Sequence, residues 1–497
     1  MGSEGKPART SPRRLKGFRD ITAADVLARD RMIARVRAVY EGYGFVPLET
    51  PALEYLDALG KFLPDSDRPD GGVFAMRDED EEWIALRYDL TAPLSRYVAM
   101  NPDLPRPFRR YQVGPVFRME KPGPGRFREF YQFDFDSVGT GSMLADAECC
   151  TIMGDAFEAI GIARNDYVIR VNDRKVLNGV LEAVAGGEAL SGDVAHNVLR
   201  SVDKLDRVGL EGVKTLLGAG RRDESGDFTR GVGLSAAQIE VVSRYLSIKG
   251  KTRAAVCNEL ESLVGESAVG REGVGELREI DAALTDAGYR EDRVIFDPTV
   301  VRGLAYYTGP VFEGVLTFEI VDESGAARQF GSVFGGGRYD GLVERFTGQK
   351  MPATGASMGV DRLLAALKAL GKTDASATTA YVLVTRLDKN LTAEYQRMAA
   401  ELRAAGVNAE LYVGTQGIGK QFKYASDTGR IVAVVMGEDE MKSGRVSIKD
   451  LRLGEELSKE VGADRRQWLE QQPAQFSVAR GEAVAAVKKV LARHLTA

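Results

Sequence analysis

The sequence predicts an α/β protein built from several domains. Its 497 residues exceed what one hydrophobic core usually holds, so about two to four domains are expected. Past residue 380, apolar strands such as AYVLVT and IVAVVMG alternate with helical patterns such as MAAELRAAG, as in a small α/β domain. Between Asn165 and Arg293, short helical patterns separated by Gly and Asp predict a mainly helical region.

The segments before that helical region predict a tail, a helix and a strand. Residues 1–14 show no hydrophobic periodicity and are rich in Pro, Ser, Gly and Arg, so we expect a disordered basic tail. From Asp25 to Tyr43 the apolar residues have helical spacing, and Gly44 ends the helix. FVPLETPALEYLDAL then predicts a strand, a proline break and a second helix.

Further strands and a linker are expected after the helical region. VIFDPTVV and VFEGVLTFEIV predict strands, and ATGASMGVDRLLAALKAL ends in an amphipathic helix. GKTDASATTA, from Gly371 to Ala380, is small and polar, which is typical of a linker. The chain ends with the helical pattern GEAVAAVKKVLARHLTA.

The composition argues against several kinds of site. Only two histidines occur, so a Ser/His/Asp triad is not expected, and the three cysteines lack the spacing of a zinc site or a disulfide framework. A net charge of -5 argues against a generally basic surface for nucleic acid. Because the chain has neither an apolar run of about 18 residues nor a signal-like start, we expect a soluble cytoplasmic protein.

The segment GTQGIGKQ, from Gly414 to Gln421, comes close to a phosphate-binding loop. Gln421 stands where that loop needs a hydroxyl for magnesium. Glycine-rich turns are common in α/β domains, so we expect any ATP site to lie elsewhere.

The segment RFREFYQFDFD predicts a strand with two different faces. One face is mostly apolar and suited to burial, and the other holds Arg126, Arg128, Phe130, Gln132, Asp134 and Asp136. A strand that faces solvent is one interpretation. The other is a ligand site, because RYQVGPVFRME and the turn KPGPG would fold back as a hairpin and bring guanidinium groups, a ring and carboxylates together.

Several segments resemble one enzyme family. FRME followed by GRFREFYQFDFDSVG resembles motif 2 of class II aminoacyl-tRNA synthetases, specifically the histidyl-tRNA synthetase family. KGFRDI with FVPLETPALEY resembles motif 1, GASMGVDRLL resembles motif 3, and GGGRYDGL resembles a glycine-rich strand of the pocket. RGLAYYTGPVFE, from Arg302 to Glu313, resembles the histidine-specific signature. Together with the tail from Ala380, the resemblance covers nearly all of residues 15–460.

The resemblance implies a domain organisation. The class II core would hold a mixed, mainly antiparallel sheet flanked by helices. The expected parts are a catalytic core over 15–164 and 294–371, a helical insertion domain over 165–293, a linker over 372–379, an anticodon-binding α/β domain over 380–470 and a C-terminal helical extension over 471–497.

It also implies an activity and partners. A histidyl-tRNA synthetase ligates L-histidine to histidine tRNA through a histidyl-adenylate and releases AMP and pyrophosphate. ATP would be a substrate that binds with Mg²⁺, without a dedicated metal site on the protein. A homodimer with Pro51 at its interface is implied, and no membrane contact is expected.

The residues expected at the ATP end match family positions. Arg118 and Arg302 would hold the α-phosphate and act in catalysis, while Arg362 would meet the outer phosphates. Phe130 would stack on adenine, with Glu120 near its amino group and Arg126 also in the ATP site. A structural ion pair is the alternative for any single arginine.

The residues expected at the histidine end match the family less closely. Asp89, Thr91 and Gln132 would bind the α-amino group, and Asp136 and Tyr307 would bind the imidazole, which needs a partner for each nitrogen. Arg302 and Tyr306 complete the set. Asp89 and Asp136 both stand where the family often has the longer Glu.

Two competing functions and one open surface remain. A catalytically inactive paralogue would be a histidine-sensing regulatory subunit, but it would tend to lose the arginines and the tail domain. A non-catalytic RNA-binding module fits the acidic net charge poorly. In the helical region, Arg200, Lys204 and Arg207 would either contact tRNA or form a solvated helix face.

Overall fold

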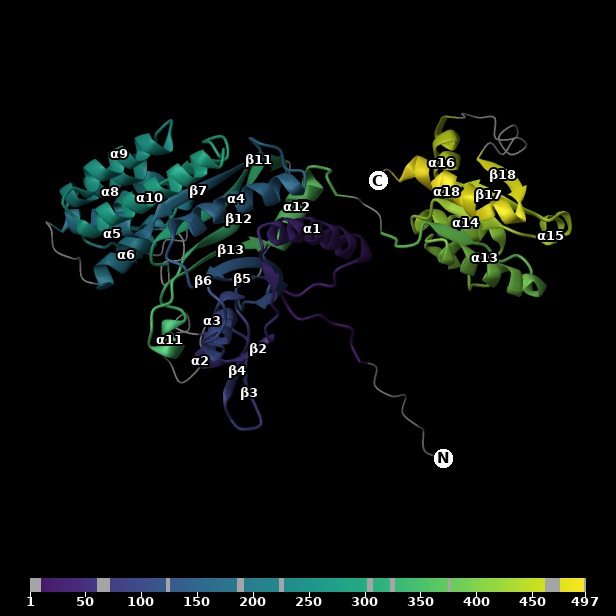
Figure 1. The fold of residues 1–497 in the computed structure, drawn as a ribbon, viewed down its shortest axis with the longest axis horizontal. Coiled ribbons are helices and arrows are strands. Elements are labelled where there is room, and N and C mark those ends of the chain that lie inside the picture. The colour runs from purple at the N-terminus through teal and green to yellow at the C-terminus, as the bar shows by residue number, and fades with distance from the viewer. Residues whose placement is uncertain are drawn as a thin grey trace. The chain divides into compact units, whose positions relative to one another are not determined.

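The protein folds into two compact units (Figure 1). One contains Met1–Asp20 and Arg29–Thr373, and the other contains Ile21–Ala28 and Asp374–Ala497. The computed structural model describes residues 10–59, 72–121, 126–185, 192–222, 228–301, 307–321, 327–373, 377–460 and 474–495. None of the helices within those ranges is both long enough and apolar enough to cross a bilayer.

An eight-stranded sheet forms the centre of the first unit. Its order is β1-β5-β6-β13-β12-β11-β7-β10. The inner pairs are antiparallel, and the two outermost pairs, β1 with β5 and β7 with β10, are parallel, so the predicted mixed, mainly antiparallel sheet is confirmed. The strands are β1 Val46–Pro47, β5 Phe108–Phe117, β6 Glu129–Val138, β13 Ala353–Gly359, β12 Ala327–Arg338, β11 Pro310–Val321, β7 Tyr167–Asp173 and β10 Val294–Phe296.

Strand β6 has the two faces that its sequence predicts. Phe133 and Phe135 are fully buried, and both rings contact Tyr40 of helix α1 (Ala23–Gly42), at centroid distances of 4.7 and 4.8 Å. Such contacts remove large apolar areas from water and fix the sheet against the helix. The opposite face of β6 is therefore left for polar side chains. Helices α4 (Met143–Ala159) and α12 (Val360–Ala369) also pack on the sheet.

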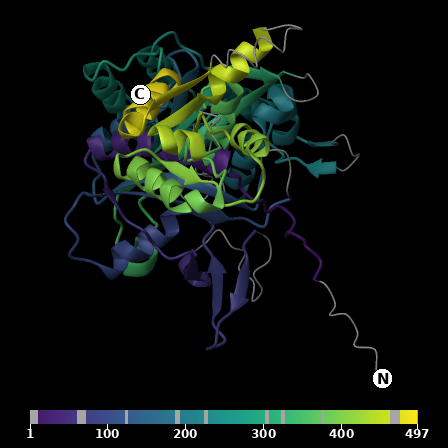
Figure 2. The same cartoon turned by 90° about the vertical axis from the view of Figure 1, so that its right-hand side faces the viewer.

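A small antiparallel sheet follows the first strand. It consists of β2 (Leu53–Tyr55), β4 (Trp83–Leu86) and β3 (Ala75–Arg77). Figures 1 and 2 show β3 and β4 projecting from the first unit as a hairpin. Three short helices complete this part of the fold, namely α2 Leu56–Leu59, α3 Thr91–Met100 and α11 Glu344–Thr347.

The helical region lies at one end of the first unit (Figure 1). Its helices begin at side-chain caps such as Ser235, whose hydroxyl accepts from Gln238 N in a capping box. Helices α5 and α10 cross so closely that a Cβ on Gly179 would lie 2.4 Å from the Gly270 Cα. The elements are α5 Arg174–Val184, α6 Gly192–Val202, α7 Leu205–Leu217, β8 Gly220–Arg222, β9 Phe228–Arg230, α8 Ala236–Ser247, α9 Arg253–Val264 and α10 Ala268–Asp286.

The expected start of the helical insertion at residue 165 needs a correction. Strand β7, within the 165–293 range, pairs with β11 and β10 and belongs to the central sheet. Its sequence YVIRVND alternates buried and partly exposed residues, as a sheet strand does. The helical part therefore begins at Arg174, where the Asp173 side chain caps α5.

The second unit is a five-stranded α/β domain. Its sheet has the order β15-β14-β16-β17-β18, parallel among the first three strands and antiparallel after them. The strands are β14 Val382–Val384, β15 Ala409–Leu411, β16 Val432–Val435, β17 Arg445–Asp450 and β18 Gln475–Ala479. The helices are η1 Lys389–Leu391, α13 Thr392–Ala404, α14 Ile418–Asp427, α15 Glu438–Ser443, α16 Leu451–Glu460, η2 Arg480–Glu482 and α18 Ala483–His494.

The separate helical extension expected over 471–497 is wrong. Strand β18 pairs with β17, and Ala483, Val487 and Val490 of α18 are fully buried in the core of this domain. The hydrophobic effect of closing that core keeps the end of the chain within the domain.

The near match to a phosphate-binding loop has a structural explanation. Gln421 is only 1% exposed, and its side chain accepts from Arg386 N and donates to Arg386 O. The amide thus ties α14 to the end of β14, in the position where a nucleotide-binding loop has a hydroxyl.

Candidate active site

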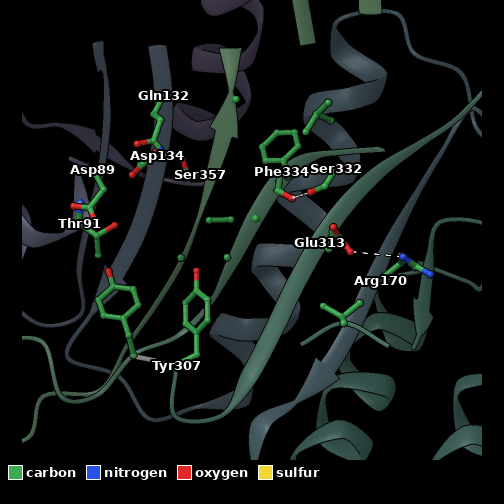
Figure 3. A pocket seen from close by; sticks show the side chains of 18 of the residues that line it. Asp89, Thr91, Gln132, Asp134, Arg170, Tyr307, Glu313, Ser332, Phe334 and Ser357 are labelled. Atoms are coloured by element: carbon green, nitrogen blue, oxygen red, sulfur yellow. Dashed lines mark hydrogen bonds and ion pairs between the residues drawn. The ribbon is translucent and has the colours of Figure 1, made fainter. Parts of the chain in front are cut away.

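A pocket of about 1010 Å³ opens over the polar face of the central sheet. Figure 3 shows its side chains, which come from β6, β7, β11, β12, β13 and the segment that leads into α3. Of the predicted site residues, the pocket is lined by Asp89, Thr91, Arg118, Phe130, Gln132, Asp136, Tyr307 and Arg362.

The other four predicted site residues fall into two groups. Glu120 and Arg126 are exposed near the turn that connects β5 and β6, and they do not line the pocket. Arg302 and Tyr306 lie outside the described residues.

Arg118 lies between two aromatic rings. Its guanidinium carbon is 4.3 Å from the centroid of Tyr88 and 5.1 Å from the centroid of Phe130. The Nε also donates to Tyr88 O over 3.3 Å. These contacts orient a permanent positive charge in the pocket beside a ring that has space for a planar ligand.

Asp89 lies just before the start of helix α3. Its Oδ1 accepts from the backbone N–H groups of Thr91 (3.1 Å) and Ala92 (2.9 Å), which would otherwise lack partners at the helix start. One oxygen of the predicted α-amino ligand is therefore used by the protein itself.

Gln132 and Asp134 form the middle of the pocket floor. The Gln132 side-chain nitrogen donates to the Ser357 hydroxyl over 2.6 Å, and Ser357 lies opposite Asp134 in the β6–β13 pair. Asp134 is 2% exposed. Burial raises the pKa of Asp134 to about 7, and Asp136 and Asp89 act in the same direction, while Arg110 and a hydrogen bond from Ser357 oppose the rise.

Asp136 is held more firmly than its neighbour. Its Oδ2 is 2.9 Å from Nη2 of the fully buried Arg110, and its Oδ1 accepts from the Tyr339 hydroxyl. Burial raises the pKa of Asp136 despite both contacts. A Cβ on Gly355 would lie 2.4 Å from Asp136 Oδ1, so glycine is required at this point of β13.

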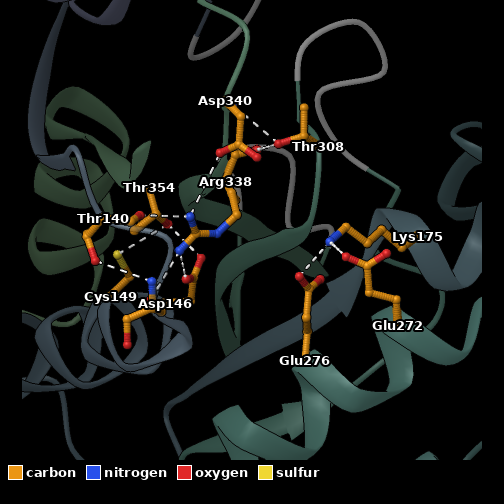
Figure 4. Close-up of polar contacts among 11 residues, drawn as sticks. Thr140, Asp146, Cys149, Lys175, Glu272, Glu276, Thr308, Arg338, Asp340 and Thr354 are labelled. Carbon is orange, nitrogen blue, oxygen red and sulfur yellow. Dashed lines mark hydrogen bonds and ion pairs between the residues drawn. The ribbon is translucent and has the colours of Figure 1, made fainter. Parts of the chain in front are cut away.

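A second polar cluster fixes the backbone beside Tyr307 (Figure 4). Arg338 is buried, forms an ion pair with Asp146 and donates to Thr140 O over 3.0 Å. Its own carbonyl accepts from Thr308 N over 2.8 Å, directly after Tyr307. The cluster therefore positions the described end of the 302–313 segment.

The far end of the pocket joins β7, β11 and β12. Arg362 Nη1 donates to Ser332 O over 2.9 Å. Arg170 forms an ion pair with Asp297 at 2.7 Å, and its Nη1 lies 3.7 Å from Glu313 Oε2 (Figure 3). This end offers two guanidinium groups, with Arg170 already neutralised in part.

Several pocket residues have no role assigned to them in the sequence prediction. The sequence could have indicated two of them. Tyr88 is adjacent to the predicted residue Asp89 in LRYDLTA, and Asp134 lies between Gln132 and Asp136 on the same face of QFDFD. Tyr339 and Ser357 lie in the glycine-rich and motif 3 segments, but no local pattern shows which side chains face the pocket. Arg170 and Thr299 come from β7 and the segment after β10, and only the sheet order brings them here.

Comparisons with known proteins identify close relatives. A family model described as "Histidyl-tRNA synthetase" matches residues 17–363, and one described as "Anticodon binding domain" matches residues 380–489. A protein of Cereibacter sphaeroides named "Histidine--tRNA ligase" is 55% identical over 483 residues, 96% of this chain and 97% of its own. A protein of Rhizobium meliloti with the same name is 54% identical over 481 residues, 96% of this chain and 95% of its own.

A solved structure is also similar over nearly the whole chain. It is the crystal structure of histidyl-tRNA synthetase from Nostoc sp. PCC 7120, with a TM-score of 0.75 and 30% sequence identity. The match covers 97% of this chain and 100% of that one.

Proposed function

Because the chain belongs to the histidyl-tRNA synthetase family, we propose that it joins L-histidine to histidine tRNA at the pocket of the central sheet. It is a histidine–tRNA ligase, a class II aminoacyl-tRNA synthetase, and its reaction depends on ATP. The observation that best supports the location is the shared pocket of Arg118, Phe130 and the polar face of β6. The competing regulatory-subunit function is not supported by relatives that match almost the full chain.

The reaction has two steps. A carboxylate oxygen of histidine attacks the α-phosphorus of ATP, the bond to the β-phosphate oxygen breaks, and pyrophosphate leaves. A terminal ribose hydroxyl of the tRNA then attacks the histidyl carbonyl carbon, and AMP leaves. The first step gains from charge placed where negative charge develops, which is the role we assign to Arg118 together with Arg302.

The ATP end would use the residues around Arg118. Phe130 would stack on adenine beside the guanidinium, and Arg362 would meet the outer phosphates. Glu120 and Arg126 would meet the nucleotide from the turn end of the β5–β6 hairpin.

The histidine end would use the polar floor. Asp89, Thr91 and Gln132 would face the α-amino group, while Asp136, Tyr306 and Tyr307 would surround the imidazole. Asp136 accepts from the Tyr339 hydroxyl and forms an ion pair with Arg110, and its Oδ2 has no hydrogen-bond donor among the described residues, so the carboxylate can accept from an imidazole N–H.

Mg²⁺ would enter with the nucleotide. Among the described residues, no three His, Cys, Asp or Glu side chains are grouped to hold a metal ion. The ligands of the ion would be mainly phosphate oxygens and water, and the ion would neutralise charge on the outer phosphates.

A homodimer is proposed through the first strands. Val46, Leu53, Tyr55 and Met76 are between 44% and 55% exposed, on edge strand β1 and on the small sheet. Apolar side chains at unpaired sheet edges are typical of surfaces covered by a second copy. Sedimentation of the wild type and of Tyr55→Asp checks this, since the variant should shift toward monomer.

The remaining parts would serve the tRNA. The helical region from Arg174 would contact the acceptor arm, and the second unit would bind the anticodon, which matches the family model over residues 380–489. The cytoplasm, where tRNA charging takes place, is the proposed location.

Histidine-dependent exchange of labelled pyrophosphate into ATP tests the function. The wild type should catalyse exchange with L-histidine and then charge histidine tRNA. A folded protein that binds histidine without exchange would instead be a sensor.

A further inference from the structure

Two buried side-chain oxygens on β6 have neither a hydrogen-bond partner nor an ion pair among the described residues. They are Oε1 of Gln132 and Oδ1 of Asp134. The side chains occupy successive positions on one face of the strand and both line the pocket (Figure 3). An acceptor without a donor is costly to bury, so the pair is built for a ligand that brings donors.

Asp134 forms no ion pair among the described residues, although Arg110 attracts its carboxylate. The one ion pair of Arg110 with a pocket carboxylate is to Asp136. Arg87, in the segment before α3, donates to Pro115 O and Thr50 O, so its guanidinium is used by backbone carbonyls. Asp89 adds a further negative charge near Asp134. The neighbouring strand β13 faces Asp134 with the uncharged Ser357 hydroxyl, and the neutral Tyr40 lies on the other side of the sheet.

The free Oδ1 therefore faces a pocket with an excess of negative charge. Burial and two neighbouring carboxylates raise the pKa of Asp134, as expected for a site where a bound cation would stabilise the ionised carboxylate. The Ser357 hydroxyl accepts from Gln132 and stabilises the ionised Asp134, which links the two acceptors into one unit.

The cation of free histidine near neutral pH is the α-ammonium group, because the imidazole is mainly neutral above its reference pKa of about 6.5. An ammonium group carries three N–H donors and no acceptor, which complements the two unsatisfied oxygens. We propose that Asp134 provides the principal negative charge for the α-ammonium group of histidine, with Gln132 Oε1 as a second acceptor.

This assignment changes the role of Asp89. Its Oδ1 already holds two N–H groups of α3, so it acts chiefly by shaping the start of that helix beside the ligand. The proposal rests on the proposed function, since it concerns the amino acid that the enzyme activates. It adds a residue that the family resemblance alone does not indicate.

The test compares two ligands that differ only in the ammonium group. L-Histidine and 3-(imidazol-4-yl)propanoate are titrated calorimetrically into the full-length wild type and into Asp134→Asn, which keeps the side-chain shape without the charge. Asp155→Asn is the matched control, because Asp155 accepts from Tyr43 and Tyr289 and does not line the pocket. Near-ultraviolet circular dichroism checks that each variant is folded, and Asp134→Ser replaces Asn if needed.

Asp134→Asn should weaken L-histidine binding by about 10- to 150-fold, the usual range for a hydrogen bond to a charged group. Binding of the propanoate should be nearly unchanged, and Asp155→Asn should leave both affinities as in the wild type. An unchanged preference for L-histidine in Asp134→Asn overturns the proposal, and so does an equal loss of both ligands, which would indicate a structural role. Absence of pyrophosphate exchange in the wild type would instead contradict the proposed function.

Discussion

The Gln132 side-chain nitrogen donates to the Ser357 hydroxyl over 2.6 Å and joins β6 to β13 at the pocket floor. The two residues are more than 200 positions apart in the sequence, and only the antiparallel pairing of these strands brings them together. The bond fixes the amide so that its oxygen stays directed away from Ser357.

Removing this hydroxyl should affect histidine and not ATP. Ser357→Ala leaves the Gln132 amide without its acceptor and takes a donor from Asp134. We expect the KM for histidine to rise about 5- to 10-fold, consistent with about 1 kcal/mol for one hydrogen bond, with the KM for ATP little changed. Steady-state exchange kinetics measure both values. Ser262→Ala, on an exposed turn of α9, is the control, and an equal change in both variants would contradict the prediction.

Replacing Arg118 should abolish the first chemical step. Arg118→Ala removes the positive charge between Tyr88 and Phe130, and we expect at least about 100-fold slower exchange, in the range for loss of one charge-stabilising donor. Arg118→Lys should restore little, because an ammonium group cannot reproduce the planar fork. Thermal unfolding should change little, since the side chain is only partly buried. Full activity of the lysine variant would argue for a simple surface charge.

The glycine at residue 355 should tolerate no side chain. Its Cβ would lie 2.4 Å from both Asp136 Oδ1 and Phe135 O. Gly355→Ala should cost about 1–3 kcal/mol of unfolding free energy and weaken histidine binding, because Asp136 must shift. Gly141→Ala is matched, since nothing lies within 4 Å of its Cβ position. Urea unfolding of both variants measures this cost. Equal unfolding midpoints for Gly355→Ala and Gly141→Ala would refute the steric argument.

Histidine binding should depend on pH through Asp134. Its pKa is raised to about 7 in the free protein, so the carboxyl is mostly neutral at pH 6 and mostly ionised at pH 8. Only the ionised form attracts an ammonium group, so affinity should increase as the pH rises through this window, by about tenfold overall.

Free histidine also gains an imidazole proton below about pH 6.5, which affects every variant alike. The informative quantity is therefore the ratio of affinities of the wild type and Asp134→Asn. A ratio that stays constant from pH 6 to pH 8 would exclude titration of Asp134 as the cause.

Much of the fold follows from local patterns in the sequence. The α1 helix, the β5–β6 hairpin and the alternating second unit have periodicities that match their elements. Two domain boundaries are predicted wrongly, namely the start of the helical insertion and the separate C-terminal extension. In both cases a strand is assigned to the wrong part of the protein. The YVIRVND segment and the QFSVA segment are short strands whose partners, β11 and β17, lie elsewhere in the chain, so no local signal shows which sheet they join.

The site divides in the same way. Residues within one motif, such as Phe130, Gln132 and Asp136 on β6, share a face because of the two-residue period, and this places them in one pocket from sequence alone. Asp134 also lies on that face, but it lacks an ion pair because Arg110 pairs with Asp136, and only the coordinates show this. Tyr339 is identified only by its contact with a buried carboxylate.

The most direct test of the account is pyrophosphate exchange by the full-length protein with each of the twenty amino acids. We expect exchange with L-histidine, little exchange with any other amino acid, and loss of exchange in Arg118→Ala. Equal exchange with several amino acids, or none with histidine in a folded protein that binds ATP, would contradict it.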